Sequence, residues 1–109
     1  MGLQKQTISI SSRDYWFKIV EFIQQNWALI ENYSDGKSCI VFFISDAAGV
    51  FDKLNFESVA KAEQGLLRNG FRRYSDDKEA QGFIAPPKPL FFEAKHPNGP
   101  IYSSGRFWK

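Results

Sequence analysis

The sequence has little of the chemistry that catalytic or cross-linked proteins use. Its 109 residues include one cysteine, Cys39, one histidine, His96, and one methionine. A single cysteine excludes a disulfide bond within the chain and fits a reducing compartment, so we expect a cytoplasmic protein. The N-terminal residues have no apolar run of signal-peptide length. The longest apolar run, residues 39–44, is far shorter than the roughly 20 residues of a membrane-spanning helix, so we expect no membrane partner.

Charge is also modest, and it is unevenly distributed. The formal net charge is +2, and residues 68–109 hold eight of the 14 Lys and Arg residues but four of the 12 Asp and Glu residues. Arg68, Arg72 and Arg73, together with residues 106 and 109, could contact nucleic acid. Arg72 and Arg73 are adjacent, however, and would point to opposite faces of a strand. Nucleic-acid binding is therefore a secondary hypothesis beside a solvated strand face, with Arg68 near a helix end.

Aromatic residues are abundant, with eleven Phe, four Tyr and three Trp. This is more ring surface than a core of this size readily encloses, so we expect some rings at a contact surface. The last residues include Tyr102, Arg106 and Trp108, which are residue types that dominate interface hot spots. This tail either packs back on its own domain or docks on a partner, and the sequence leaves both alternatives open.

The spacing of apolar residues predicts one α+β domain over residues 1–109. Alternation predicts strands, and a recurrence every three to four residues predicts helices. In chain order we expect a strand (5–11), a helix (13–32), two strands (37–45 and 50–53), a helix (56–69) and a strand (71–75). This is the order of a ferredoxin-like βαββαβ two-layer sandwich.

A Pro-rich, aromatic C-terminal extension over residues 76–109 is expected to follow this core, which covers residues 1–75. Asp76 and Glu79 are spaced to cap a short helix over residues 76–83. An edge strand is expected over residues 90–93, beyond three prolines that favour an extended path.

Residues 37–45 constrain the predicted architecture most. Both faces of this strand are apolar, with Ile40, Phe42 and Ile44 on one and Cys39, Val41 and Phe43 on the other. Such a strand should be an inner one, covered on both sides. Because the ferredoxin-like arrangement places both helices on one face, the face of Cys39, Val41 and Phe43 needs another cover. The tail, a second copy of the chain in a homodimer, or a small apolar or anionic ligand could provide it.

A ligand on that face would meet aromatic rings, with an arginine to orient a negative group. The candidate ligand-binding residues are Phe43, Arg73, Phe91, Phe92, Tyr102, Arg106 and Trp108.

Catalysis is less favoured than binding. Cys39 lies within an apolar strand, where a thiol has neither the access nor the lowered pKa of a nucleophile. An enzyme would have to use His96 with Asp76, Asp77 or Glu93, yet His96 precedes a proline in a loop. No spacing of ligands indicates a metal, and no glycine-rich phosphate loop is present. We therefore predict a non-catalytic binding or interaction module without catalytic residues, metal or cofactor.

Two motifs carry a resemblance. Asn69-Gly-Phe-Arg-Arg-Tyr74 and the ending from His96 to Trp108 are similar to small uncharacterised bacterial proteins of the integron gene-cassette type. The resemblance covers about residues 50–109 and implies a bacterial, cytoplasmic, stand-alone protein. It implies no activity, ligand or site residue.

Overall fold

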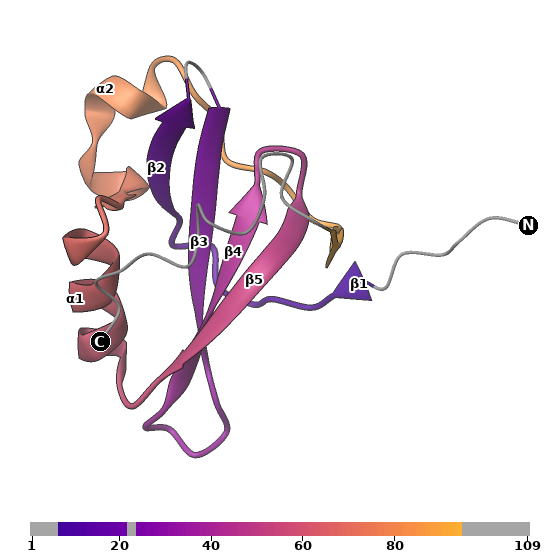
Figure 1. Ribbon diagram of the computed structural model, residues 1–109, viewed down its shortest axis with the longest axis vertical. Coiled ribbons are helices and arrows are strands. Elements are labelled where there is room, and N and C mark those ends of the chain that lie inside the picture. Colours follow the sequence, from indigo (N-terminus) through magenta and orange to yellow (C-terminus); the bar gives the residue numbers. More distant parts are fainter. Residues whose placement is uncertain (1–6, 22–23, 95–109) are drawn as a thin grey trace, which may run out of the picture.

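The computed structural model describes residues 7–21 and 24–94 (Figure 1). Its elements, in chain order, are β1 (Thr7–Ile8), β2 (Trp16–Glu21), β3 (Gln24–Asn32), β4 (Cys39–Ser45), β5 (Gly49–Phe56), α1 (Val59–Arg68), β6 (Arg72–Arg73), the 3₁₀ helix η1 (Tyr74–Asp76), α2 (Lys78–Gln81) and β7 (Phe91–Glu93). The described strands form one mixed sheet in the order β1-β7-β5-β4-β3-β2-β6. Only the β5–β7 pair is parallel among the described pairings. None of the helices in this part of the chain is long and apolar enough to span a membrane.

The ferredoxin-like βαββαβ prediction is wrong, because residues 13–32 do not form a helix. They hold β2 and β3, which pair antiparallel with Trp16 opposite Ala28 and Phe17 opposite Trp27. Phe17 and Leu29 are buried in the cluster on one face of the sheet, and their neighbours Trp16 and Ala28 are buried in the cluster on the other. Apolar side chains on both faces are typical of inner strands, and the Trp, Phe and Ile residues here favour strands. The helical spacing was therefore a coincidence within two strands that are apolar on both faces.

The prediction of an inner strand over residues 37–45 is confirmed. The observed strand β4 pairs with β3 on one side and with β5 on the other. Cys39, Val41 and Phe43 are fully buried on one face of the sheet, and Ile44 is fully buried in the cluster on the other face. The sheet therefore has two separate apolar clusters, one on each face.

The first cluster lies beneath α1 and is called the helix-side cluster; its buried members are Trp16, Ala28, Cys39, Val41, Phe43, Ala62, Leu66 and Phe71. Helix α1, which lies alongside the central strands in Figure 1, thus covers the face of Cys39, Val41 and Phe43. The sequence had assigned this cover to the tail, a second copy or a ligand. The cover differs because the predicted helix over residues 13–32 is absent. Helix α1 packs on this face, whereas Ala80 of α2 belongs to the cluster on the opposite face.

Helix α1 is shorter than the predicted helix over residues 56–69. Phe56 still belongs to β5, where it pairs with Cys39. Ser58 is the N-cap, and its Oγ accepts a hydrogen bond from the Lys61 N–H at 3.2 Å. Gly70 follows the C-cap with φ +87°, a left-handed conformation that glycine adopts without strain, so the predicted stop of the helix is confirmed.

The second cluster, on the opposite face, includes Tyr15, Phe17, Trp27, Ile44 and Phe91. Described parts of the predicted extension contribute to it, because Ala80 and Phe91 are buried there. The Tyr15 hydroxyl donates a hydrogen bond to the Pro87 carbonyl at 2.6 Å and fixes the Pro-rich segment to the segment before β2. Strand β7 falls within the range predicted for an edge strand, but it lies between β1 and β5.

Candidate functional site

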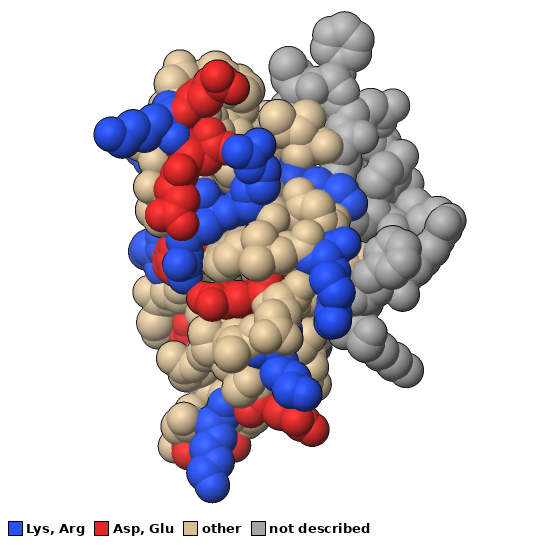
Figure 2. Space-filling model, turned by 90° about the vertical axis from the view of Figure 1, so that its left-hand side faces the viewer, with Lys and Arg blue, Asp and Glu red and all other residues tan. Residues whose placement is uncertain are grey.

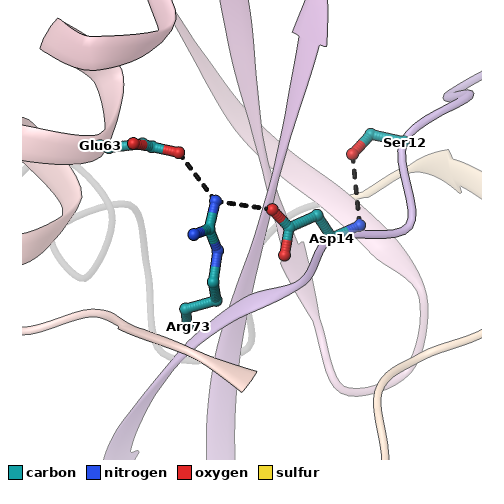
Figure 3. Close-up of polar contacts among 4 residues, drawn as sticks. All are labelled: Ser12, Asp14, Glu63 and Arg73. Carbon is teal, nitrogen blue, oxygen red and sulfur yellow. Dashed lines mark hydrogen bonds and ion pairs between the residues drawn. The ribbon is translucent and has the colours of Figure 1, made fainter. Parts of the chain in front are cut away.

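Arg73 connects three parts of the chain at the β6 end of the sheet (Figure 3). Strand β6 pairs with β2, and this pairing places Arg73 opposite Trp16. The Arg73 Nη2 atom lies 2.8 Å from Asp14 Oδ2, in the segment before β2, and 2.8 Å from Glu63 Oε2, on α1. The Asp14 N–H donates to the Ser12 Oγ at 3.3 Å. The guanidinium thus holds α1, β6 and the segment before β2 together.

The electrostatic environment of Arg73 is strongly favourable to its charge. Burial lowers the pKa of Arg73, but the hydrogen bond and charge of Asp14, with the charges of Glu63 and Asp76, outweigh it and raise the pKa. The guanidinium carbon also lies 5.0 Å from the centroid of the Trp16 ring, within the range of a cation–π interaction. Arg73 was predicted to orient an anionic ligand. In the structure, the carboxylates of Asp14 and Glu63 contact its guanidinium instead.

A hollow of about 390 Å³ lies beside this cluster, and we call it the α1–η1 hollow. Its described lining residues are Trp16, Glu63, Leu67, Arg72, Arg73, Asp76 and Asp77. Leu67 on α1 is 59% exposed, whereas Trp16 is 4% exposed. Figure 2 shows the face that carries α1 and α2, where uncharged surface is framed by acidic and basic side chains.

The second arginine of the hollow is also ion-paired. Arg72 Nη2 lies 3.0 Å from Asp77 Oδ2, and the Arg72 side chain is 71% exposed. Asp77 is held in place because its Oδ1 accepts the N–H of Ala80 at 3.0 Å and caps α2. Arg72 and Arg73, two of the basic residues that suggested nucleic-acid binding, thus both form ion pairs within the chain.

Two buried N–H donors of the hollow-lining residues have no hydrogen-bond acceptor in the described structure: Trp16 Nε1 and Arg73 Nε. A buried donor usually finds an acceptor, because leaving one unsatisfied costs about 1–3 kcal/mol. Both nitrogens are closed to solvent, so the hollow itself presents an exposed leucine and paired charges.

The predicted ligand-binding residues do not gather at one place. Phe43 lies in the helix-side cluster, with its ring centroid 5.8 Å from that of Phe71, whereas Phe91 lies in the cluster of the opposite face. Phe92 is half-buried and pairs with Thr7. Three further candidates lie outside the described residues: Tyr102, Arg106 and Trp108.

A larger trough of about 700 Å³ lies where β5 diverges from β7. Its described lining residues are Thr7, Ile8, Phe42, Val50, Phe51, Asp52, Lys53, Glu93 and Ala94. None of them was predicted as a ligand-binding residue. Thr7 and Ala94 are the outermost described residues, so the trough borders segments outside the description.

The residues of the enzyme hypothesis fall in different places. Asp76 and Asp77 line the α1–η1 hollow, Glu93 lines the trough, and His96 lies outside the described residues. Burial raises the pKa of the Cys39 thiol, which is fully buried. Within residues 7–21 and 24–94, no group of His, Cys, Asp and Glu side chains is placed to hold a metal ion.

Sequence reasoning missed most of the α1–η1 hollow. It gave no binding role to Trp16, Asp14, Glu63 or Leu67. The local signal was the proximity of Arg72 and Arg73 to Asp76 and Asp77. Nothing in the sequence indicates that Asp14 and Glu63 approach the same guanidinium, since three distant segments meet there.

No family model, no curated protein and no solved structure matches this chain. The resemblance to integron-cassette proteins therefore remains a prediction, and the geometry alone supports the functional argument.

Proposed function

We propose that this protein is a non-catalytic binding module that recognises a partner protein at the α1–η1 hollow. The observation that carries the proposal is a hollow in which the exposed Leu67 lies among charged side chains that ion pairs hold in place. Protein interfaces combine an apolar centre with a polar rim, and Trp and Arg are enriched among their hot spots.

The site is also preorganised. Arg73 joins β6 to α1 and to the segment before β2 through two contacts of 2.8 Å. Asp77 joins β6 and α2 through its cap and its ion pair with Arg72. A partner would therefore meet side chains that are already positioned, which reduces the entropic cost of binding.

The lining of the hollow favours binding over catalysis. Its described members include no His, Cys, Ser or Lys that could act as a nucleophile or base near neutrality. Glu63 and Asp77 are engaged by arginines. We also propose a cytoplasmic location, which a single buried cysteine fits.

Selection of random peptides displayed on phage tests the proposal with matched variants. Leu67→Ser removes the exposed leucine of the hollow, and Leu90→Ser makes the same change at a leucine that is 73% exposed elsewhere. Burying a leucine is worth about 1.5–3 kcal/mol, so selected peptides should bind L67S about ten- to a hundredfold more weakly and L90S unchanged. No enriched peptide, or equal losses with both variants, would overturn the proposal.

A second copy of the chain is the other occupant that this experiment must separate. Light scattering of the wild type, L67S and L90S gives the mass in solution. A dimer that L67S alone dissociates would identify the partner as another copy of the chain, whereas a monomeric wild type would support a different protein.

A further inference from the structure

We propose that residues 85–89 form a preorganised polyproline II ligand, which is bound by the aromatic-lined groove of a partner domain. This surface is separate from the α1–η1 hollow, so the inference goes beyond the proposed function. It follows from the spacing of the prolines, from two tyrosines that hold the segment and from which of its residues are exposed.

The sequence of the segment restricts its backbone to extended conformations. Pro86, Pro87 and Pro89 each have φ fixed at about −65° by the proline ring. Ala85, Pro86 and Lys88 each precede a proline, which disfavours the α-helical region for them. Together these restrictions favour polyproline II, a left-handed helix with about three residues per turn and no internal hydrogen bonds.

Two tyrosine hydroxyls hold the segment at this three-residue period. The Tyr74 hydroxyl donates a hydrogen bond to the Ile84 carbonyl at 2.7 Å, and the Tyr15 hydroxyl donates to the Pro87 carbonyl at 2.6 Å. Both tyrosine rings pack on Trp27, with centroids 5.4 and 5.8 Å from that of its ring. Carbonyls three residues apart point to opposite sides of a β-strand but to the same side of a polyproline II helix. The two hydrogen bonds therefore fix one edge of such a helix to the domain.

The burial of the side chains follows the same period. Ile84 packs half-buried against the cluster that contains Trp27, and Pro87 is buried. The accessible residues form two Xaa-Pro pairs on either side of Pro87, namely Ala85-Pro86 and Lys88-Pro89. Pro86 is half-buried in the first pair, and the other three residues of the two pairs are exposed.

Two Xaa-Pro pairs at this spacing fit a groove that recognises polyproline II helices. Aromatic side chains line such grooves, and they exploit the low conformational entropy of the preformed helix. The edge that Tyr15 and Tyr74 hold faces the domain, so a groove can contact the two remaining edges without displacing it. Because the segment is held in place before it binds, the entropic cost of binding is reduced.

Lys88 adds a charge that specifies the partner further. It is exposed, and it forms no ion pair within the part of the chain that the structure describes. An acidic side chain at the rim of the groove would complement this charge. We therefore infer a partner domain with an aromatic groove and an acidic rim.

Selection from a library of SH3 domains displayed on phage tests the inference. The library keeps the aromatic residues of the groove and randomises the loops beside it, and the bait is the full chain. We expect the enriched domains to bind Pro86→Ala and Pro89→Ala about five- to twentyfold more weakly than the wild type, since each alanine removes two methylenes from the contact. Lys88→Gln should weaken binding about two- to fivefold, the range of an exposed ion pair.

Phe83→Ala is the matched control. Phe83 is 64% exposed and precedes Ile84, so this variant removes a larger apolar side chain without changing either Xaa-Pro pair. F83A and the hollow variant L67S should bind the enriched domains as well as the wild type does. Tyr15→Phe keeps every contact residue but releases the Pro87 carbonyl, so it should weaken binding about two- to tenfold, the range of one hydrogen bond.

The outcomes decide the inference independently of the proposed function. No enriched domain, or an equal loss of affinity for F83A and P89A, would overturn it. Unchanged binding of Y15F would also overturn it, because the tyrosine would then contribute nothing to preorganisation. Domains that are sensitive to Pro86 and Pro89 but not to L67S would establish a second binding surface, whatever the peptide selection finds at the α1–η1 hollow.

Discussion

Arg73→Met removes the guanidinium that joins α1, β6 and the segment before β2, and keeps most of the aliphatic stem. The Asp14 and Glu63 ion pairs are about one-third to one-half exposed, so each contributes about 0.5–1 kcal/mol. The cation–π contact with Trp16 adds about 0.5–1 kcal/mol. We therefore expect R73M to lower the free energy of unfolding by about 1.5–3 kcal/mol.

Urea denaturation measures this loss. With a slope of about 1.5 kcal/mol per M, typical of a small domain, the midpoint should fall by about 1–2 M. The loss should shrink at high salt, because screening weakens the partly exposed ion pairs. Arg72→Met is the control, since Arg72 has a single ion pair and is 71% exposed, so its loss should stay below about 1 kcal/mol. Equal midpoints for the two variants would refute the role assigned to Arg73.

Three further predictions concern other parts of the fold. Burial raises the pKa of Glu31, but the N–H groups of Ser11 and Ser12 outweigh it and hold the pKa below its ordinary 4.5. The wild type should therefore be more stable than Glu31→Gln above about pH 4.5 and lose this lead as the pH falls through the lower folded-state value; urea midpoints at neutral and acid pH test this, and a constant lead contradicts it. Iodoacetamide should modify Cys39 only after unfolding, because the thiol is fully buried, and rapid labelling of the native protein in a mass spectrum would show otherwise. Gly70→Ala should cost about 1–2 kcal/mol in thermal or urea unfolding and Gly70→Asn less, since φ is +87°; an alanine variant as stable as the wild type would exclude this strain.

The segments that could be predicted from the sequence are those whose own residues identify the type of element. Strand β4 is apolar on both faces, and this alone identified it as an inner strand. Helix α1 has one apolar stripe and ends at Asn69-Gly70, and both features are local.

The hairpin of β2 and β3 could not be recognised in the same way. Its two strands are buried on both faces, so their apolar residues also satisfy a helical spacing. Phe22-Ile23, between the two strands, contains none of the residues typical of a turn. The choice between helix and hairpin was made by tertiary pairing of β3 with β4, which no local pattern reports.

The candidate site depends on tertiary structure even more. Arg73 was singled out from the sequence, but its partners Asp14 and Glu63 belong to segments that meet it only in the folded sheet. Because residues 13–32 form strands and not the predicted helix, Trp16 pairs with Arg73 of β6 and lines the hollow. The sequence therefore identified Arg73 as a candidate site residue, but it did not identify the side chains that contact it.

The pairing of β6 with β2 has a consequence for synthesis of the chain. Residues 16–56, which form β2 to β5, leave the ribosome before Arg72 and Arg73 do. Until then, the backbone of β2 beside Trp16 and Phe17 lacks the neighbour that later covers it. Such uncovered strand edges promote association between incomplete chains. The two-residue strand β6 therefore covers the edge of β2 at Trp16 and Phe17 only once residues 72 and 73 have been made.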